Sequence, residues 1–186
     1  MAQKTEKAIA DALKKLLAKR PLSKITISDI ANECGINRMT FYYHYRDVYD
    51  LIKTIADEDL KGALEGNRTL ADWQEGVLKL MTVVKKDKAF YTNLYHSVER
   101  DRTTDYVYDL ISELLKEGVD QLPSTVRAPE ADIQFIVDFY AYAFVGILLQ
   151  WVRKGMQEEP AVLVERMGKL GKGGLGRGVE AFSDRC

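Results

Sequence analysis

The chain has 186 residues, of which 46% are hydrophobic and 30% charged, with 27 basic and 28 acidic side chains. This length allows a sizeable hydrophobic core, and so apolar a chain with a net charge of −1 is not intrinsically disordered. The two cysteines, Cys34 and Cys186, have no partner at metal-ligand spacing and cannot form a disulfide framework. We therefore expect a cytoplasmic protein with reduced thiols, no metal site and no cofactor.

No membrane segment is expected. The first twenty residues are charged throughout and contain no apolar signal-peptide core. The most apolar stretch, Ile136 to Val152, has 17 residues and includes Asp138, whereas a membrane-spanning helix needs about 20 apolar residues. We predict a buried helix there.

The charge is divided unevenly along the chain. Residues 1–46 carry nine basic and four acidic side chains, whereas residues 47–186 carry 18 basic and 24 acidic ones. A basic N-terminal piece on a larger acidic body suggests an end that faces nucleic acid.

Hydrophobic residues recur at helical spacing along most of the chain. The expected helices cover about 5–19, 26–35, a short segment after Asn37, 47–64, 70–86, 88–98, 102–121, 130–154 and 160–170. Thr26 and Asp29 stand at capping-box spacing, Gly35 suits a helix end with positive φ, and Asn37 can cap the third helix. No long stretch alternates with period two, so the predicted fold class is all-α.

The segment from Ile25 to Tyr45 has the pattern of a helix-turn-helix, with two short helices joined by a tight turn at residues 33–37. An ordinary corner between two helices is the alternative. If Phe41 and Tyr45 face inward, the second helix presents an outward set that suits phosphates and base edges rather than a plain solvent face. This set comprises Arg38, Met39, Thr40, Tyr43 and His44.

Residues 25–52, ITISDIANECGINRMTFYYHYRDVYDLI, resemble the N-terminal domain of the tetracycline-repressor (TetR/AcrR) family of transcriptional regulators. The matching positions are Thr26, Ile30, Ala31, Gly35, Ile36, Thr40, Phe41, Tyr42, Tyr45 and Leu51. Within the family, FYYHYRDVYDL is most similar to regulators related to the dihydroxyacetone-kinase operon activator. The resemblance implies a three-helix DNA-binding domain at residues 1–46 and a helical ligand-binding and dimerisation domain at 47–186, which dimerises through its last two helices.

The resemblance also implies roles for individual residues. Those expected to hold phosphates are Thr26, Thr40, Tyr42 and His44, and those expected to reach base edges are Ser28, Arg38, Met39 and Tyr43. One position departs from the family, because Val48 stands where a phosphate-binding lysine is usual. We expect Arg46 or Lys53 to supply part of the missing charge.

The body offers candidates for an effector pocket and a dimer interface. Aromatic residues cluster in it, and core packing is the alternative explanation for any one of them. The candidate ligand-binding residues are Tyr95, His96, Tyr106, Phe139 and Tyr142. Residues 130–154 are apolar on almost every face, which favours a two-fold homodimer through this helix. The candidate interface residues are Phe144, Ile147, Leu148 and Trp151.

Enzymatic chemistry is not expected. Residues 171–176 satisfy G-x-G-x-x-G, but that motif binds dinucleotides only between a strand and a helix, and the preceding residues follow a helical pattern. The six glycines between residues 168 and 178 are expected to loosen the last helix or leave the tail partly mobile. No nucleophile, base and orienting group can be assembled from the sequence.

Two functions remain. The favoured one is a homodimeric, sequence-specific regulator on a palindromic operator in double-stranded DNA, with its affinity controlled by a small-molecule or protein effector. The alternative is an all-α ligand-binding or protein-interaction module that no longer reads DNA, which Val48 keeps open. Whether binding represses or activates is open as well.

Overall fold

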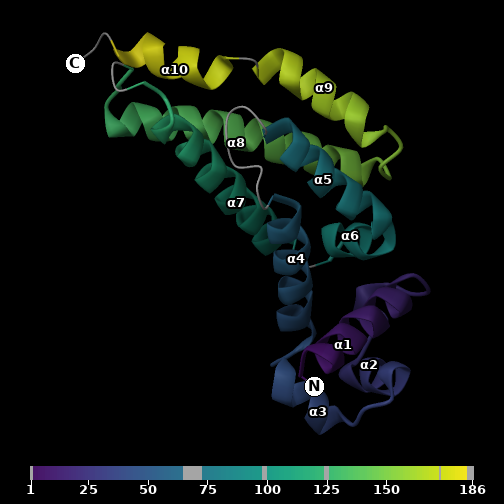
Figure 1. Ribbon diagram of the computed structural model, residues 1–186. Helices are drawn as coiled ribbons and strands as arrows, with labels where there is room; N and C mark the ends of the chain where they lie inside the picture. Colours follow the sequence, from purple (N-terminus) through teal and green to yellow (C-terminus); the bar gives the residue numbers. More distant parts are fainter. Residues whose placement is uncertain (1, 65–72, 98–99, 124–125, 172, 184–186) are drawn as a thin grey trace.

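Figure 1 shows a helical molecule in which a small N-terminal group of helices lies at one end of a larger body. This computed structural model describes residues 2–64, 73–97, 100–123, 126–171 and 173–183. The N-terminal group consists of α1 (Ala2–Leu17), α2 (Ile27–Cys34) and α3 (Arg38–His44), with a 3-10 turn at Leu22–Lys24. The described ranges contain no strand, so the prediction of an all-α fold is confirmed.

Helix α4 (Val48–Leu64) leads from this group into the body. The other helices of the body are α5 (Trp73–Lys86), α6 (Lys88–Tyr95), α7 (Arg100–Asp120), α8 (Glu130–Arg153), α9 (Pro160–Gly171) and α10 (Gly174–Ser183). Helices α7 and α8 pack against each other, and α9 and α10 lie along the outer side of the body (Figure 1).

One continuous hydrophobic core joins the N-terminal group to the body. Ile9 of α1, Phe41 of α3 and Leu51 of α4 are completely buried, and they belong to the same cluster as Trp151 at the end of α8. A smaller cluster lies at the other end of the body, where Ile136 packs against α10. The N-terminal group is therefore held on the body by apolar packing.

Helix α8 is apolar on most faces but buried on only some of them. By length and composition it could cross a membrane, with a third of its most apolar window buried in the protein. It packs against α6, α7 and α10. Its outward side carries Phe135, Phe139 and Tyr142, which are 62%, 64% and 63% exposed.

The glycine-rich segment near the C-terminus interrupts the helical run, because α9 ends at Gly171 and a separate helix, α10, begins at Gly174. A partly mobile tail stays a prediction. The chain turns at Gly173, whose φ is 66°, and then resumes as α10. A Cβ added at Gly174 would overlap the Tyr140 hydroxyl of α8, and one at Gly178 would lie 3.2 Å from the Cγ2 atom of Ile136. These glycines thus allow α10 to approach α8 closely.

Candidate nucleic-acid interface

Helix α2 begins with the capping box that the sequence predicted. The Asp29 amide donates to the Thr26 hydroxyl over 3.2 Å, and the Thr26 amide donates to the Asp29 carboxylate over 2.8 Å. The Thr26 hydroxyl also donates to the Asp29 carboxylate over 2.7 Å, and the Arg20 guanidinium forms an ion pair with the same carboxylate at 3.0 Å. Hydrogen bonds from Thr26, followed by the one from Arg20, lower the pKa of Asp29 to about 2. The start of α2 is therefore fixed by local contacts.

The turn between α2 and α3 has helix-turn-helix geometry. Gly35 ends α2 in the left-handed region, with φ 71° and ψ 31°. The Ile36 amide returns to the Ala31 carbonyl over 2.9 Å, and the Ile36 side chain packs against the core. Asn37 then caps α3 by accepting the Thr40 amide over 2.8 Å. The predicted cap residues at both ends of the turn are confirmed.

Helix α3 buries one side and exposes the other. Phe41 is completely buried and Tyr45 is 7% exposed, whereas Met39 is 75% and Tyr43 84% exposed. Met39 and Tyr43 are four residues apart, so they lie on the same face of the helix. Together they form an exposed apolar surface that we call the α3 face.

Other predicted DNA-contacting residues surround the α3 face in different states. Arg38 is exposed and Tyr42 is 44% exposed. Three others are already engaged or partly covered within the protein. The Thr26 hydroxyl belongs to the capping box, the Thr40 hydroxyl donates to Asn37, and Ser28 is half-buried.

The expectation that His44 faces outward is wrong. Its side chain is 7% exposed, and its Nδ1 atom lies 3.2 Å from a carboxylate oxygen of Glu6 on α1. At 3.6 residues per turn, His44 lies only about 80° from the direction that Phe41 and Tyr45 share. It therefore stands at the edge of the buried side, where α1 covers it.

The segment that follows α3 contains Val48, at the position where the family usually has a phosphate-binding lysine. Val48 is the first residue of α4 and packs partly buried against the core, so this position offers no charge to DNA. The Arg46 side chain is 88% exposed, and its guanidinium lies 3.5 Å from Asp50. Lys53 is also exposed. A phosphate contact by Arg46 or Lys53 stays a prediction.

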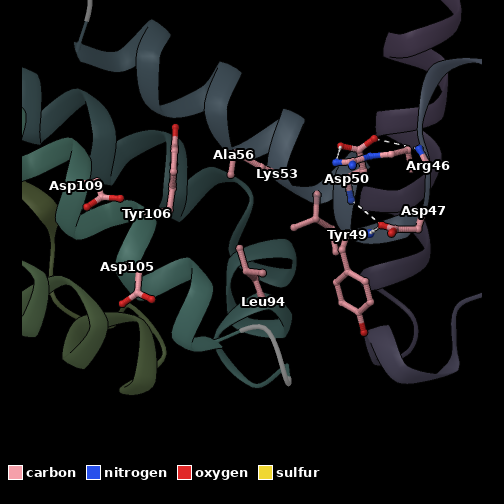
Figure 2. Close-up of a pocket in the computed structure, with 11 residues that line it drawn as sticks. Arg46, Asp47, Tyr49, Asp50, Lys53, Ala56, Leu94, Asp105, Tyr106 and Asp109 are labelled. Atoms are coloured by element: carbon pink, nitrogen blue, oxygen red, sulfur yellow. Dashed lines mark hydrogen bonds and ion pairs between the residues drawn. The ribbon is translucent and has the colours of Figure 1, made fainter.

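A cavity of about 460 Å³ lies between α4 and α7, next to the N-terminal group. Figure 2 shows Arg46, Asp47 and Asp50 on one side of it and Tyr106 on the other, with Leu94 between them. The Tyr106 hydroxyl is buried, and burial together with Asp57 raises its pKa, so it stays protonated. This cavity, the α4–α7 groove, is open to solvent and polar at its rim.

The structure does not bring the five predicted ligand-binding residues together. Only Tyr106 lines the α4–α7 groove, while Tyr95 is buried in the core and His96 is exposed at the end of α6. Phe139 and Tyr142 lie on the outward side of α8. Because α8 is apolar all round, its sequence alone does not reveal which face points outward.

The predicted interface residues of α8 are also distributed differently from expectation. Trp151 is 4% exposed within its own protomer, where its indole N–H donates to the Glu158 carbonyl over 2.8 Å. Phe144 packs edge-on against Trp73 at 5.3 Å between ring centroids, and Ile147 and Leu148 are half-buried. The uncovered aromatic stripe is instead Phe135, Phe139 and Tyr142, which we call the α8 stripe. Its spacing of four and three residues puts the three rings on one side of the helix, but apolar residues on the other sides hide this pattern in the sequence.

Known regulators match both parts of the chain. Residues 9–55 match the family described as bacterial regulatory proteins, tetR family, and residues 71–173 match the family described as transcriptional regulator C-terminal region. The second match covers more than half of the chain.

Two relatives found by sequence are described as helix-turn-helix (HTH-type) transcriptional regulators. The HTH-type dhaKLM operon transcriptional activator DhaS of Lactococcus lactis subsp. lactis (strain IL1403) is 29% identical over 91 residues, which is 49% of each chain. The HTH-type transcriptional regulator EthR of Mycobacterium tuberculosis (strain ATCC 25618 / H37Rv) is 34% identical over 67 residues, which is 36% of this chain and 31% of EthR. The aligned region thus spans about half of the first relative and about a third of the second.

Solved structures agree along nearly the whole chain. The dihydroxyacetone kinase operon activator DhaS superposes with a TM-score of 0.74 at 20% identity, covering 96% of this chain and 97% of DhaS. NalD of Pseudomonas aeruginosa, the secondary repressor of the MexAB-OprM multidrug efflux pump, gives 0.67 at 18%, covering 96% and 98%. At these identities the agreement concerns the fold. The two family matches go further, and they establish that this chain is a transcriptional regulator, not an enzyme, and belongs to the TetR family.

Proposed function

We propose that the protein is a homodimeric, sequence-specific DNA-binding regulator of cytoplasmic location, in which α3 enters the major groove. The observation that carries this proposal is the α3 face, where Met39 and Tyr43 are the most exposed apolar side chains of the N-terminal group. Two large apolar side chains exposed next to each other are typical of a surface that contacts a partner. Apolar contact with thymine methyl groups and base edges in the major groove would cover these two side chains.

The rest of the N-terminal group supports the same placement. Arg38 lies at the N-terminal end of α3, which is the end that contacts base edges in helix-turn-helix proteins. The capped start of α2 and the Asn37 cap fix where both helices begin. A rigid recognition helix loses little entropy on binding, which favours specificity.

Dimerisation through the α8 stripe is the second part of the proposal. Three aromatic side chains, each more than 60% exposed, lie along one side of a helix of 24 residues. Aromatic residues are enriched at the centres of protein interfaces. A two-fold dimer would place its two α3 helices on half-sites about 34–36 Å apart, which matches a palindromic operator.

Effector control is the third part, and we place the effector in the α4–α7 groove. Its volume of about 460 Å³ falls in the range of small-molecule sites. Residues 46–53 at its rim follow directly after α3, so a ligand there contacts the chain next to the recognition helix. An effector changes operator affinity to the extent that it binds the two conformations differently.

The decisive experiment is fluorescence-anisotropy titration of DNA from upstream of the protein's own gene, beside scrambled DNA, at several salt concentrations. Replacing Tyr43 with alanine should weaken selective binding by roughly 5- to 150-fold, because one base-edge contact contributes about 1–3 kcal/mol. Leu170→Ala is the matched control, since Leu170 is 82% exposed on α9, far from α3.

Selective binding that Tyr43→Ala weakens and Leu170→Ala leaves alone supports the proposal. Equal weak binding to every sequence tested, upstream and other promoters included, with Tyr43→Ala unchanged, would reject α3 as a recognition helix. The interaction-module alternative would then take its place.

A further inference from the structure

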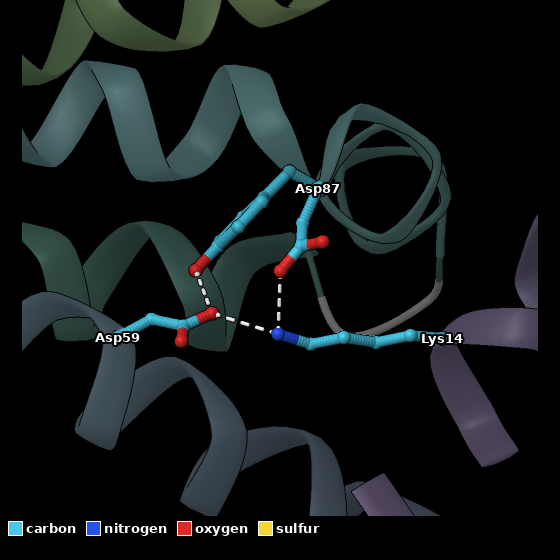
Figure 3. Close-up of polar contacts among 4 residues, drawn as sticks. Lys14, Asp59 and Asp87 are labelled. Atoms are coloured by element: carbon cyan, nitrogen blue, oxygen red, sulfur yellow. Dashed lines mark hydrogen bonds and ion pairs between the residues drawn. The ribbon is translucent and has the colours of Figure 1, made fainter. Parts of the chain in front are cut away.

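A charged network joins the N-terminal group of helices to the body (Figure 3). The Nζ atom of Lys14 on α1 lies 2.5 Å from Asp87 Oδ2 and 3.2 Å from Asp59 Oδ2. Asp59 belongs to α4, and Asp87 lies at the junction of α5 and α6. A single cation of the N-terminal group thus contacts two separate elements of the body.

The surroundings of Lys14 favour its charged form. Burial alone lowers the pKa of Lys14, but the hydrogen bonds and charges of Asp87 and Asp59 outweigh it and raise the pKa, so Lys14 is charged at neutral pH. The Tyr91 hydroxyl donates to Asp59 over 3.0 Å. Burial and the Asp59 charge raise the pKa of Tyr91, so its hydroxyl keeps the proton that it donates.

A second polar contact ties the same two parts together. Asn93 of α6 accepts the Leu22 amide over 3.3 Å through its side-chain oxygen. Its side-chain nitrogen donates to the carbonyl of Leu17, the last residue of α1, over 3.2 Å. Helix α6 therefore contacts the end of α1 through Asn93. The contacts of Lys14 with Asp59 and Asp87 lie about one helical turn before that end.

We propose that Lys14, Asp59 and Asp87 form a latch that sets the position of the N-terminal group on the body and transmits movements of α4 and α6 to α3. Partly buried ion pairs depend steeply on geometry, and a charge that loses its partner is strongly destabilising. Without Lys14 the two carboxylates would face each other unneutralised, so α4 and the α5–α6 junction would separate. A displacement of α4 or of the α5–α6 junction would break the same two ion pairs.

The consequence for DNA rests on the proposed function, whereas the latch itself can be tested without DNA. Spin labels on Asn32→Cys of α2 and Ala161→Cys of α9, with Cys34 and Cys186 changed to serine, report the distance between the N-terminal group and the body by pulsed electron paramagnetic resonance. Labelled chains are diluted with unlabelled ones so that distances within one protomer dominate.

The variants are Lys14→Met and the milder Asp87→Asn. Lys85→Met is the matched control, because Lys85 pairs with Glu159 at 2.6 Å but joins two parts of the body only. If Lys14→Met fails to fold, the distance distribution of Asp87→Asn tests the latch by itself. Operator affinity is measured on the same proteins by anisotropy.

We expect both latch variants to shift or broaden the distance distribution beyond that of Lys85→Met, and to change operator affinity by roughly fivefold or more, the usual size of an allosteric coupling. An unchanged distribution overturns the latch. A changed distribution with unchanged operator affinity overturns its role in transmission. If the unmodified protein binds no DNA selectively while the distribution still changes, the latch stands and the proposed function fails.

Discussion

The change Gly→Ala should have opposite effects at Gly35 and at Gly62. Gly35 has φ 71°, in the left-handed region, and a Cβ there would meet nothing within 4 Å. The cost of Gly35→Ala is therefore the backbone conformation alone, about 1–2 kcal/mol. Gly62 lies inside α4, where a Cβ would also meet nothing within 4 Å. Gly62→Ala should stabilise by about 0.5–1 kcal/mol, because glycine loses more backbone entropy than alanine in a helix.

Urea unfolding followed by circular dichroism measures both effects, at one protein concentration because dimer formation would alter the apparent stability. The free energies of unfolding of the two variants should differ by about 1.5–3 kcal/mol, the sum of the two effects. Gly35→Asn should recover part of the loss, since asparagine enters the left-handed region more readily than alanine does. If Gly35→Ala is as stable as the parent protein, the left-handed cap is not what requires glycine at this turn.

Four further outcomes are expected. Phe41→Ala should lower the free energy of unfolding by about 3–5 kcal/mol in the same assay, because this ring is completely buried; a loss below about 1 kcal/mol would contradict its place in the core. The lowered pKa of Asp29, about 2 against 3.8, means that its contribution is present above pH 3.8 and is lost as the pH falls to about 2. The difference in the free energy of unfolding between the parent protein and Asp29→Asn should therefore shrink over that interval. A difference that does not change with pH would contradict the lowered pKa of Asp29. Arg46→Ala should reduce the salt slope of DNA binding by about 0.9 if Arg46 contacts one phosphate, and an unchanged slope removes it from the interface. Phe139→Ser should yield monomers in sedimentation velocity at concentrations where the parent protein is dimeric, and an unaltered dimer would place the interface elsewhere.

Local signals in the sequence predicted the helix-turn-helix correctly. Thr26 with Asp29, Gly35 and Asn37 mark helix ends through contacts that reach only three or four residues along the chain. Such contacts form whatever the rest of the protein does, so one sequence suffices to find them. The inward position of Phe41 was predicted from its helical spacing with Tyr45, although its burial depends on the packing of several helices.

The sequence failed where distant segments decide which side chain is covered. His44 turns inward because Glu6, 38 residues earlier, lies against it. The glycines between residues 168 and 178 gave no sign of a close contact, yet those at 174 and 178 let α10 pack tightly on α8. In both cases a contact between elements outweighed the local preference.

Periodicity and short-range hydrogen bonds were enough to predict the helical class, the capped turn and the presence of a recognition-type helix. The burial of Trp151 in the core and the outward position of Phe139 depend instead on how the helices pack together. The same packing brings Lys14 to Asp59 and Asp87, which are 45 and 73 residues away along the chain. An all-apolar helix has no preferred face of its own, and a charged side chain has many partners within reach. The choice among them is made by the packing of the whole chain.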